Sequence, residues 1–373
     1  FFPPKQRNSF TFASMVNLLA FYLPQFHPIP ENDAWWGKGF TEWTNTTRAK
    51  PLFPGHRQPH LPADLGFYDL RSPESREAQA NLARQHGLSG FIYWHYWFGD
   101  GKRLLERPFE EVVRSGKPDF PFCLAWANQS WTGVWHGLDG RTLIEQRYPG
   151  KQDHIDHFHT LLPAFSDRRY IRIGNRPLFF VYEPATFPNL REFTGLWNGL
   201  AIRNGLGGIY FVGVNHLAWD YRADGFDGVT VYMPGHYIDT YQEHLFRAYK
   251  NSFKRHILRR FPLVIQYEEI LKAYHYDRFA NRDFIPCIVP NWDNTPRSGQ
   301  RGMVFQGSTP ALFGRHLRDA IRFASEGERE HRMVIIKSWN EWAEGNYLEP
   351  DREWGTARLE EIAKAVMEGG TAS

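Results

Sequence analysis

Two glutamates near the end of the chain have the residue type and the spacing for acid–base chemistry. Glu341 and Glu344 stand in a segment that also holds Trp339, Trp342 and Tyr347. If the backbone between the acids makes one helical turn, their side chains lie roughly 5–6 Å apart on one face. This is close to the separation of the two carboxyls in enzymes that cleave glycosidic bonds with retention. A surface turn with solvated acids is the alternative, but such turns rarely place several aromatic residues between the acids.

Cleavage of a glycosidic bond assigns a different task to each carboxyl. One protonates the leaving oxygen, and the other acts as nucleophile or base. The acid must keep its proton near neutral pH, and the aromatic side chains of Trp339, Trp342 and Tyr347 would raise its pKa by excluding water. A second carboxylate nearby acts in the same direction. Spacing alone leaves open which of the two glutamates is the acid.

The acids follow the last of eight short apolar segments, each of which has the composition of a buried strand. These segments are residues 17–23, 90–94, 121–126, 177–182, 209–214, 228–232, 284–289 and 333–337. Helical patterns separate most of them, the first opened by Ser72 and Pro73 and the later ones at 104–113, 153–165, 190–204, 243–260, 265–275, 309–325 and 359–367. Near-continuous apolar strands that alternate with helices indicate a parallel sheet, and eight of them close a barrel. The prediction is an α/β fold, a single (β/α)₈ TIM barrel with long loops after its strands, above all after the first. An open doubly wound sheet is the rival, but no glycine-rich phosphate loop follows the first strand.

The composition restricts the class of protein. Aromatic residues make up 16% of the chain, with 14 Trp, and such side chains cover the apolar faces of sugars. A net charge of +3 gives no case for a nucleic-acid partner. No apolar run is long enough to span a membrane, and Cys123 and Cys287 are expected to be buried free thiols. We expect residues 1–14 to be a leader or tag, residues 15–373 to form one catalytic domain, and the protein to be cytoplasmic.

In a barrel the side chains at the carboxyl ends of the strands line the site, which selects further candidates. The first strand and the loop after it, residues 25–73, offer Tyr22, Gln25, His27, Glu42 and Trp43, with His27 and Glu42 as partners for sugar hydroxyls. A purely structural loop is the alternative. The candidates from the other strand ends are His95, Tyr96, Trp126, Asn128, Gln129, Tyr232, Asn291, Trp292, Trp339, Asn340 and Tyr347.

Four motifs carry a resemblance to a known family. Residues 21–33, 36–43, 61–71 and 339–346 resemble the WbsX-type proteins, bacterial relatives of glycoside hydrolase family 99. The similarity covers nearly all of residues 17–360. It implies a (β/α)₈ barrel, a substrate of oligo- or polysaccharide, and a place among the genes for surface polysaccharides such as the O-antigen of lipopolysaccharide.

The resemblance also implies roles for the two acids. Family 99 enzymes are retaining endo-α-mannosidases thought to proceed through a 1,2-anhydro sugar. Glu341 resembles the residue that deprotonates the sugar's 2-hydroxyl, and Glu344 resembles the acid that later acts as base. The chain departs from the family at Gln129, where a glutamate is usual, and at residues 132–136, where an Arg-rich stretch with Asp is usual. A glutamine forms hydrogen bonds but takes no proton.

The expected function is therefore a retaining glycoside hydrolase that needs no metal or nucleotide cofactor. One rival is a glycosyltransferase of O-antigen biosynthesis, and another is a glycan-binding protein that has lost catalysis. Residues 153–159 carry three histidines among acids, which favours a solvated helix over a metal site. The basic and aromatic residues of 247–260 favour a solvated helix over contact with a membrane or a lipid-linked glycan.

Overall fold

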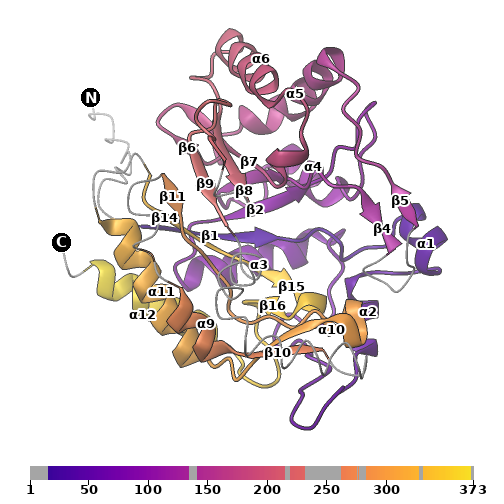
Figure 1. The fold of residues 1–373 in the computed structure, drawn as a ribbon, viewed down its shortest axis with the longest axis vertical. Helices are drawn as coiled ribbons and strands as arrows, with labels where there is room; N and C mark the ends of the chain where they lie inside the picture. Colours follow the sequence, from indigo (N-terminus) through magenta and orange to yellow (C-terminus); the bar gives the residue numbers. More distant parts are fainter. Residues whose placement is uncertain are drawn as a thin grey trace, which may run out of the picture.

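The computed structural model of the chain describes residues 16–133, 141–214, 219–231, 262–274, 276, 283–326 and 331–370. Within these ranges, nine parallel strands stand side by side in a nearly closed barrel (Figure 1). They are β1 (Asn17–Tyr22), β2 (Gly90–His95), β3 (Phe122–Trp126), β7 (Arg176–Val181), β8 (Tyr210–Val214), β9 (Gly228–Thr230), β11 (Phe284–Ile285), β12 (Cys287–Ile288) and β14 (Met333–Ile336). The predicted α/β, TIM-barrel-like fold is confirmed.

The nine strands occupy the eight predicted positions, because β11 and β12 are two pieces of one predicted strand. Pro286 lies between them and has no N–H to donate to a neighbouring strand. β11 pairs with β9, and β12 pairs with β14, so this interrupted segment joins the two ends of the sheet. The carbonyl of Pro286 still accepts a hydrogen bond from the backbone N–H of Ile335 at 2.8 Å.

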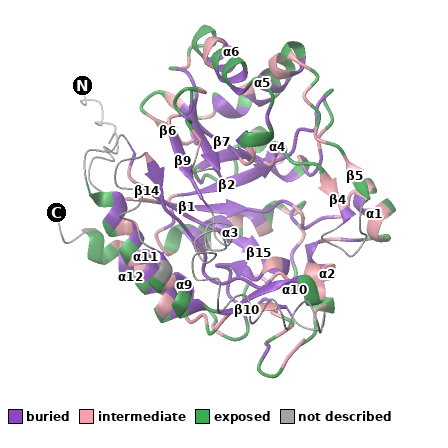
Figure 2. Cartoon of the chain, in the orientation of Figure 1, coloured by how far each residue is buried: buried purple, intermediate pink, exposed green. Residues whose placement is uncertain are grey.

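The barrel strands are mostly apolar because both of their faces are covered. Every residue of β2, β3 and β8 is buried, and Figure 2 shows the central strands as the buried part of the molecule. Strands of this kind lose the alternation of apolar and polar residues that a half-exposed sheet shows. Cys123 on β3 and Cys287 on β12 are buried free thiols, as predicted.

Helices cover the outside of the barrel. α3 (Pro73–Gln85) begins as predicted, with the Ser72 hydroxyl accepting a hydrogen bond from the backbone N–H of Ser75 at 3.2 Å. The other covering helices are α4 (Arg107–Ser115), α5 (Lys151–Phe165), α6 (Leu190–Arg203), α9 (Tyr267–Ala273), α11 (Pro310–Ser325) and α12 (Ala357–Gly370). The predicted helix 265–275 starts only at Tyr267, because β10 (Leu263–Gln266) pairs with β13 (Met303–Gln306).

Short elements that the sequence did not predict build the loops around the barrel. They are α1 (Pro30–Trp36) and α2 (Glu42–Arg48) after β1, β4 (Trp131–Thr132) with β5 (Thr142–Ile144), β6 (Arg172–Ile173), η2 (Pro184–Thr186), α10 (Thr295–Ser298), η5 (Gly299–Arg301), and β15 (Asn340–Glu341), η6 (Trp342–Glu344) and β16 (Asn346–Tyr347) after β14. Elements of two to seven residues are too short to show a helical or strand period.

Several predictions fall on residues that the structure does not describe. Residues 1–14, Tyr232 and the basic stretch 247–260 lie outside the described ranges. Among the helices that are described, none is both long and apolar enough to cross a lipid bilayer.

Candidate active site

The segment after β14 folds back on itself and places both acidic side chains. β15 and β16 form a small antiparallel pair joined by the single turn η6, so that Glu341 ends β15 and Glu344 ends η6. Gly345 follows in the left-handed conformation with φ of 65°, and a Cβ atom there would come within 2.6 Å of the backbone nitrogen of Asp293. That nitrogen donates to the carbonyl of Glu344 at 2.7 Å. The turn therefore needs glycine and is held from the β12 side of the barrel.

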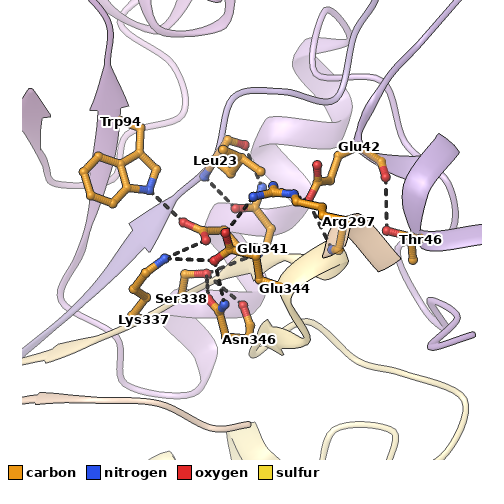
Figure 3. A network of polar contacts seen from close by, with 12 residues as sticks. Leu23, Glu42, Thr46, Trp94, Arg297, Lys337, Ser338, Glu341, Glu344 and Asn346 are labelled. Atoms are coloured by element: carbon orange, nitrogen blue, oxygen red, sulfur yellow. Dashed lines mark hydrogen bonds and ion pairs between the residues drawn. The ribbon is translucent and has the colours of Figure 1, made fainter. Parts of the chain in front are cut away.

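One buried ammonium group joins the two carboxyls (Figure 3). Lys337 directly follows β14, and its Nζ lies 2.6 Å from Glu341 Oε2 and 3.4 Å from Glu344 Oε2. Its side chain is only 4% exposed, and the same Nζ lies 5.8 Å from the ring centre of Trp94. The indole N–H of Trp94 donates to Glu341 Oε1 at 2.8 Å. Glu341 thus has a charged partner on one oxygen and a neutral donor on the other.

A second cation connects this pair to a third carboxyl. Arg297, in α10, donates to Glu344 Oε1 at 2.6 Å and to Glu42 Oε1 at 2.7 Å. Glu42 begins α2 and also accepts a hydrogen bond from the backbone N–H of Ala343 at 3.1 Å. Segments that are hundreds of residues apart in the chain are therefore tied to the η6 turn by charge.

The surroundings push the pKa values of the two acids in opposite directions. Burial has the largest effect on Glu341 and raises its pKa, although the Lys337 ammonium acts against this rise. Burial would also raise the pKa of Glu344, but the charges of Lys337 and Arg297 lower it below its ordinary value. A hydrogen bond between the two carboxyls, donated by Glu341, raises the pKa of Glu341 and lowers that of Glu344. In the free protein these shifts favour the proton on Glu341 and the negative charge on Glu344.

The acids open into a cavity of about 200 Å³ at the carboxyl ends of the strands. Its charged side, defined here as Lys337, Glu341, Glu344 and Arg297, comes from the last two strand ends. The rest of the lining is uncharged and largely aromatic or amide, namely Leu23, Gln25, Asn32, Trp36, Trp94, Tyr96, Ala127, Gln129, Ser130, Trp131, Thr132, Leu143 and Tyr182. A concave site with few charged groups and several aromatic walls is typical of small-molecule and sugar binding.

Five of the predicted site residues meet in this cavity. Glu341, Glu344, Gln25, Tyr96 and Gln129 all belong to its lining. Gln129 is exposed and donates from Nε2 to Glu183 Oε2 at 3.2 Å, so it stands beside an acid.

Two more predicted residues contact the charged side without lining the cavity. They are Glu42, through Arg297, and Trp292, whose ring centre lies 5.7 Å from Lys337 Nζ.

The other predicted residues that are described lie behind the cavity wall, where their polar atoms bind protein groups. Some of them bind other side chains: Tyr22 donates to Gln79 at 2.6 Å, His95 pairs with His157 at 2.7 Å, and Tyr347 bonds both His60 and Asp351. The others bind the backbone: His27 lies 3.1 Å from the carbonyl of Pro24, Trp43 donates to the carbonyl of Tyr68, Trp126 to that of Trp97, Asn128 to that of Glu183, and Asn340 bonds the backbone of Leu23. Asn291 and Trp339 are also buried outside the lining.

The hairpin explains why the expected aromatic neighbours of the acids lie elsewhere. In the β15–β16 pair, Asn340 stands opposite Tyr347, and Glu341 stands opposite Asn346. Opposed residues share a face of a strand pair and successive residues alternate, so Tyr347 points away from Glu341. Tyr347 instead stacks on Trp342, with ring centres 3.8 Å apart. Trp94, Tyr96 and the other lining rings take the place that the sequence had assigned to these residues.

The histidine-rich helix α5 is less solvated than its sequence predicted. On α5, Asp153 accepts from the indole N–H of Trp97 at 3.1 Å, and His157 pairs with His95, so both are buried and only one face of the helix is solvated. In the part of the chain that the structure describes, no group of three His, Cys, Asp or Glu side chains is placed to hold a metal ion.

The lining residues outside the predicted set include Lys337, Arg297, Trp94 and Asn32. Lys337 had a usable signal, since a lysine directly after a buried strand is rare on energetic grounds unless it is paired. Arg297 stands in a segment after the seventh predicted strand, but nothing near it in the sequence indicates partners at positions 42 and 344. Asn32 lies in a helix that was not predicted.

Comparison with known proteins adds a family and relatives. A family model described as "Glycosyltransferase WbsX" matches residues 18–362. Two curated proteins from two strains of Xanthomonas campestris pv. campestris, both called "Uncharacterized protein WxcX", are 38% identical to the chain over 353 residues. The matches cover 94% of this chain and 50% of each relative. The chain thus spans about half the length of these curated relatives.

Solved structures of low sequence identity share the fold. A GH99 endo-alpha-mannosidase from Bacteroides thetaiotaomicron, in complex with bis-tris-propane, superposes with a TM-score of 0.57 at 15% identity, covering 96% of this chain and 99% of that one. A "Glycoside hydrolase-like protein" gives a TM-score of 0.56 at 16% identity, covering 95% and 94%. These similarities establish a barrel of the kind found in glycoside hydrolases.

Proposed function

Because the chain belongs to the family described as "Glycosyltransferase WbsX", as its motifs predicted, we propose that it is a carbohydrate-active enzyme whose chemistry is carried by Glu341 and Glu344. The proposed reaction is the cleavage of an α-linked glycosidic bond, with net retention, in a bacterial surface polysaccharide. The observation that carries this proposal is the pair of buried carboxyls that line one cavity and share Lys337.

The charge distribution supports this chemistry. A carboxyl that keeps its proton near neutral pH can protonate a leaving oxygen, and an ionised carboxylate beside it can act as nucleophile or base. In the free protein, burial favours the proton on Glu341, while Lys337 and Arg297 keep Glu344 ionised. Because the carboxyls are in contact, the pair is best treated as one unit that holds one proton.

Two assignments of roles are compatible with that unit. If Glu341 is the acid, Glu344 attacks the sugar and forms a covalent intermediate. The resemblance to family 99 implies the reverse, with Glu344 as acid and Glu341 taking the proton of the 2-hydroxyl. A hydroxyl that donates to Glu341 favours its ionised form, so sugar binding would transfer the shared proton to Glu344 across their hydrogen bond. We propose the second assignment, since it also uses that hydrogen bond.

The variants Glu344→Gln and Glu341→Gln test both the function and the roles. On α-mannoside oligosaccharides or on the surface polysaccharide of the producing bacterium, each should lose at least about 10³-fold in the rate at which reducing ends appear. On a dinitrophenyl glycoside, whose leaving group needs no acid, only the variant that lacks the acid should keep its first step. Glu360→Gln, on the exposed face of α12, is the control. If both active-site variants cleave the unactivated substrate at the wild-type rate, the proposal is wrong. NMR of the product anomer tests whether the reaction proceeds with retention.

Sugar transfer is the second candidate, and the family description favours it. The same carboxyl pair would pass the sugar to an acceptor hydroxyl instead of water. Calorimetry with sugar nucleotides, with and without a divalent cation, tests for an activated donor. Binding of a sugar nucleotide together with no release of reducing ends would favour transfer over hydrolysis.

A further inference from the structure

Asn32 is the one buried residue of helix α1, and this helix forms part of the cavity wall. The helix is fixed to two neighbouring loops. Glu31 forms an ion pair of 2.5 Å with Lys102, which lies in the loop after β2. The ring of Trp35 packs edge-on against the ring of Trp131, which follows β3, with ring centres 5.9 Å apart. Asn32 is therefore held in a defined place.

The amide of Asn32 is buried and unpaired within the described part of the chain. Its exposed fraction is 0%, and neither Oδ1 nor Nδ2 has a hydrogen-bond partner among the described residues. Buried polar groups are nearly always hydrogen-bonded, because their desolvation is otherwise uncompensated. A leucine has almost the same size and would fill this position without that cost. The structure alone gives no reason for an amide here.

Asn340 shows how the same fold treats an asparagine that has a structural task. It is equally buried, its Oδ1 accepts from the backbone N–H of Leu23 at 2.7 Å, and its Nδ2 donates to the carbonyl of Leu23 at 3.1 Å. The two asparagines differ in one further respect, since Asn32 borders the cavity and Asn340 does not.

The position of Asn32 indicates the kind of group it would bind. Its neighbours in the lining, Gln25 and Trp36, are uncharged, and Trp36 follows Asn32 by one helical turn on the same face. The amide offers a donor and an acceptor side by side, which match two adjacent sugar hydroxyls or one acetamido group. The indole supplies an apolar face for the carbons of the ring. Since water does not reach the amide in the free protein, a ligand reaches it when Gln25 or Trp36, both partly exposed, shifts.

We propose that Asn32 is a substrate-binding residue whose Nδ2 donates to, and whose Oδ1 accepts from, one uncharged substituent of a sugar in the cavity. The proposal rests on the proposed function, because it assumes that the cavity holds a glycan. It adds a subsite on the α1 wall, apart from the charged side that acts on the bond.

Asn32→Leu tests the proposal, with Asn340→Leu as its matched control. Because no bond within the described structure is lost, Asn32→Leu should unfold at a temperature equal to or higher than that of the wild type, whereas Asn340→Leu should unfold at a clearly lower one. The ligand probes are methyl α-D-mannopyranoside, which has only hydroxyls, and methyl N-acetyl-α-D-glucosaminide. Their dissociation constants follow from ligand-detected NMR. Loss of two buried hydrogen bonds should weaken the preferred probe about tenfold or more in Asn32→Leu.

Each outcome decides a separate question. Unchanged affinity in Asn32→Leu, a drop in its unfolding temperature like that of Asn340→Leu, or a wild type that binds neither probe would overturn the subsite. Weaker binding of the preferred probe to Asn32→Leu supports the subsite. If such weakening is seen but no glycosidic bond is ever cleaved, the subsite stands and only the proposed hydrolysis fails. A preference for one probe identifies the substituent as hydroxyl or acetamido.

Discussion

Two buried glutamates of the same segment, Glu341 and Glu349, have similar surroundings on one side. Each accepts a hydrogen bond from an indole N–H, from Trp94 at 2.8 Å and from Trp342 at 2.7 Å. Burial is the largest influence on both and raises the pKa of each carboxyl above its ordinary value. By the usual criterion of a perturbed pKa, both would be candidates for an acid.

Their other partners separate them. Glu341 touches a cation and a second carboxyl and lines the cavity. Glu349 is not in that lining, and its further donors are the neutral side chains of Tyr68 at 2.9 Å and Gln79 at 2.7 Å. At Glu349 burial alone is therefore enough to raise the pKa of a carboxyl. The second carboxyl, the cation and the opening are what distinguish a site from a structural carboxyl.

The strongest way to break this distinction is to remove the cation. In Lys337→Met, Glu344 loses the main charge that keeps it ionised, so turnover at neutral pH should fall about 10²-fold or more. Removing one partner of a buried ion pair costs about 3–5 kcal/mol. The pKa of each carboxyl in the folded protein should rise, so this loss of stability should be smaller near pH 4.5 than at pH 8.5. Unfolding temperatures measured from pH 4.5 to 8.5 check the trend.

Lys364→Met is the matched control for this variant. Lys364 pairs with Glu361 at 2.9 Å on the exposed surface of α12, where solvent screens ion pairs and they contribute little to stability. Its unfolding temperature should stay near the wild-type value at every pH. A pH-independent deficit in Lys337→Met would mean that Lys337 contributes packing rather than charge.

The sequence predicted the barrel because its signals are local. Strands covered on both faces are near-continuous apolar runs, and a serine followed by a proline is a local signal for the start of a helix. The division of one strand at Pro286 and the short helices of the first loop were not predicted. The division depends on which neighbours pair with each half, and seven residues are too few for a helical period.

The site was predicted less completely for a different physical reason. Glu341 and Glu344 are close in sequence, so their spacing indicates their contact. The partners of Arg297 are 255 and 47 positions away, and only the closed barrel brings them together. Tyr347 and Trp342 were expected around the acids, but the strand alternation turns Tyr347 to the opposite face. Side-chain direction depends on the hairpin, which the sequence pattern did not show.

A matched pair of tryptophan variants sharpens the comparison. Trp94→Phe and Trp342→Phe each remove one indole N–H from a buried carboxyl and should cost a similar stability, about 1.5–3 kcal/mol. Their effects on turnover should differ, because only Trp94 lines the cavity and contacts Glu341. We expect Trp94→Phe to reduce kcat/KM about tenfold more than Trp342→Phe. If the two variants unfold at the same urea concentration and lose the same factor in kcat/KM, Glu349 and its partners would be as important to the reaction as Glu341.

The smallest expected effect concerns Glu349 itself. Burial raises its folded pKa to about 7, above the value of about 4.3 in the unfolded chain, so its contribution to stability is fully present below pH 4.3 and is lost as the pH rises through 7. The Glu349→Gln side chain cannot ionise. Its NH₂ group would face the donors that bind Glu349 in the wild type, namely Trp342, Tyr68 and Gln79, so we expect this variant to be less stable than the wild type at pH 5. The difference should narrow by about 1–3 kcal/mol towards pH 8 and level off there, while turnover stays within tenfold. A difference that is constant with pH, measured by urea unfolding against Glu360→Gln, would mean that Glu349 is ionised throughout and that burial does not dominate its pKa.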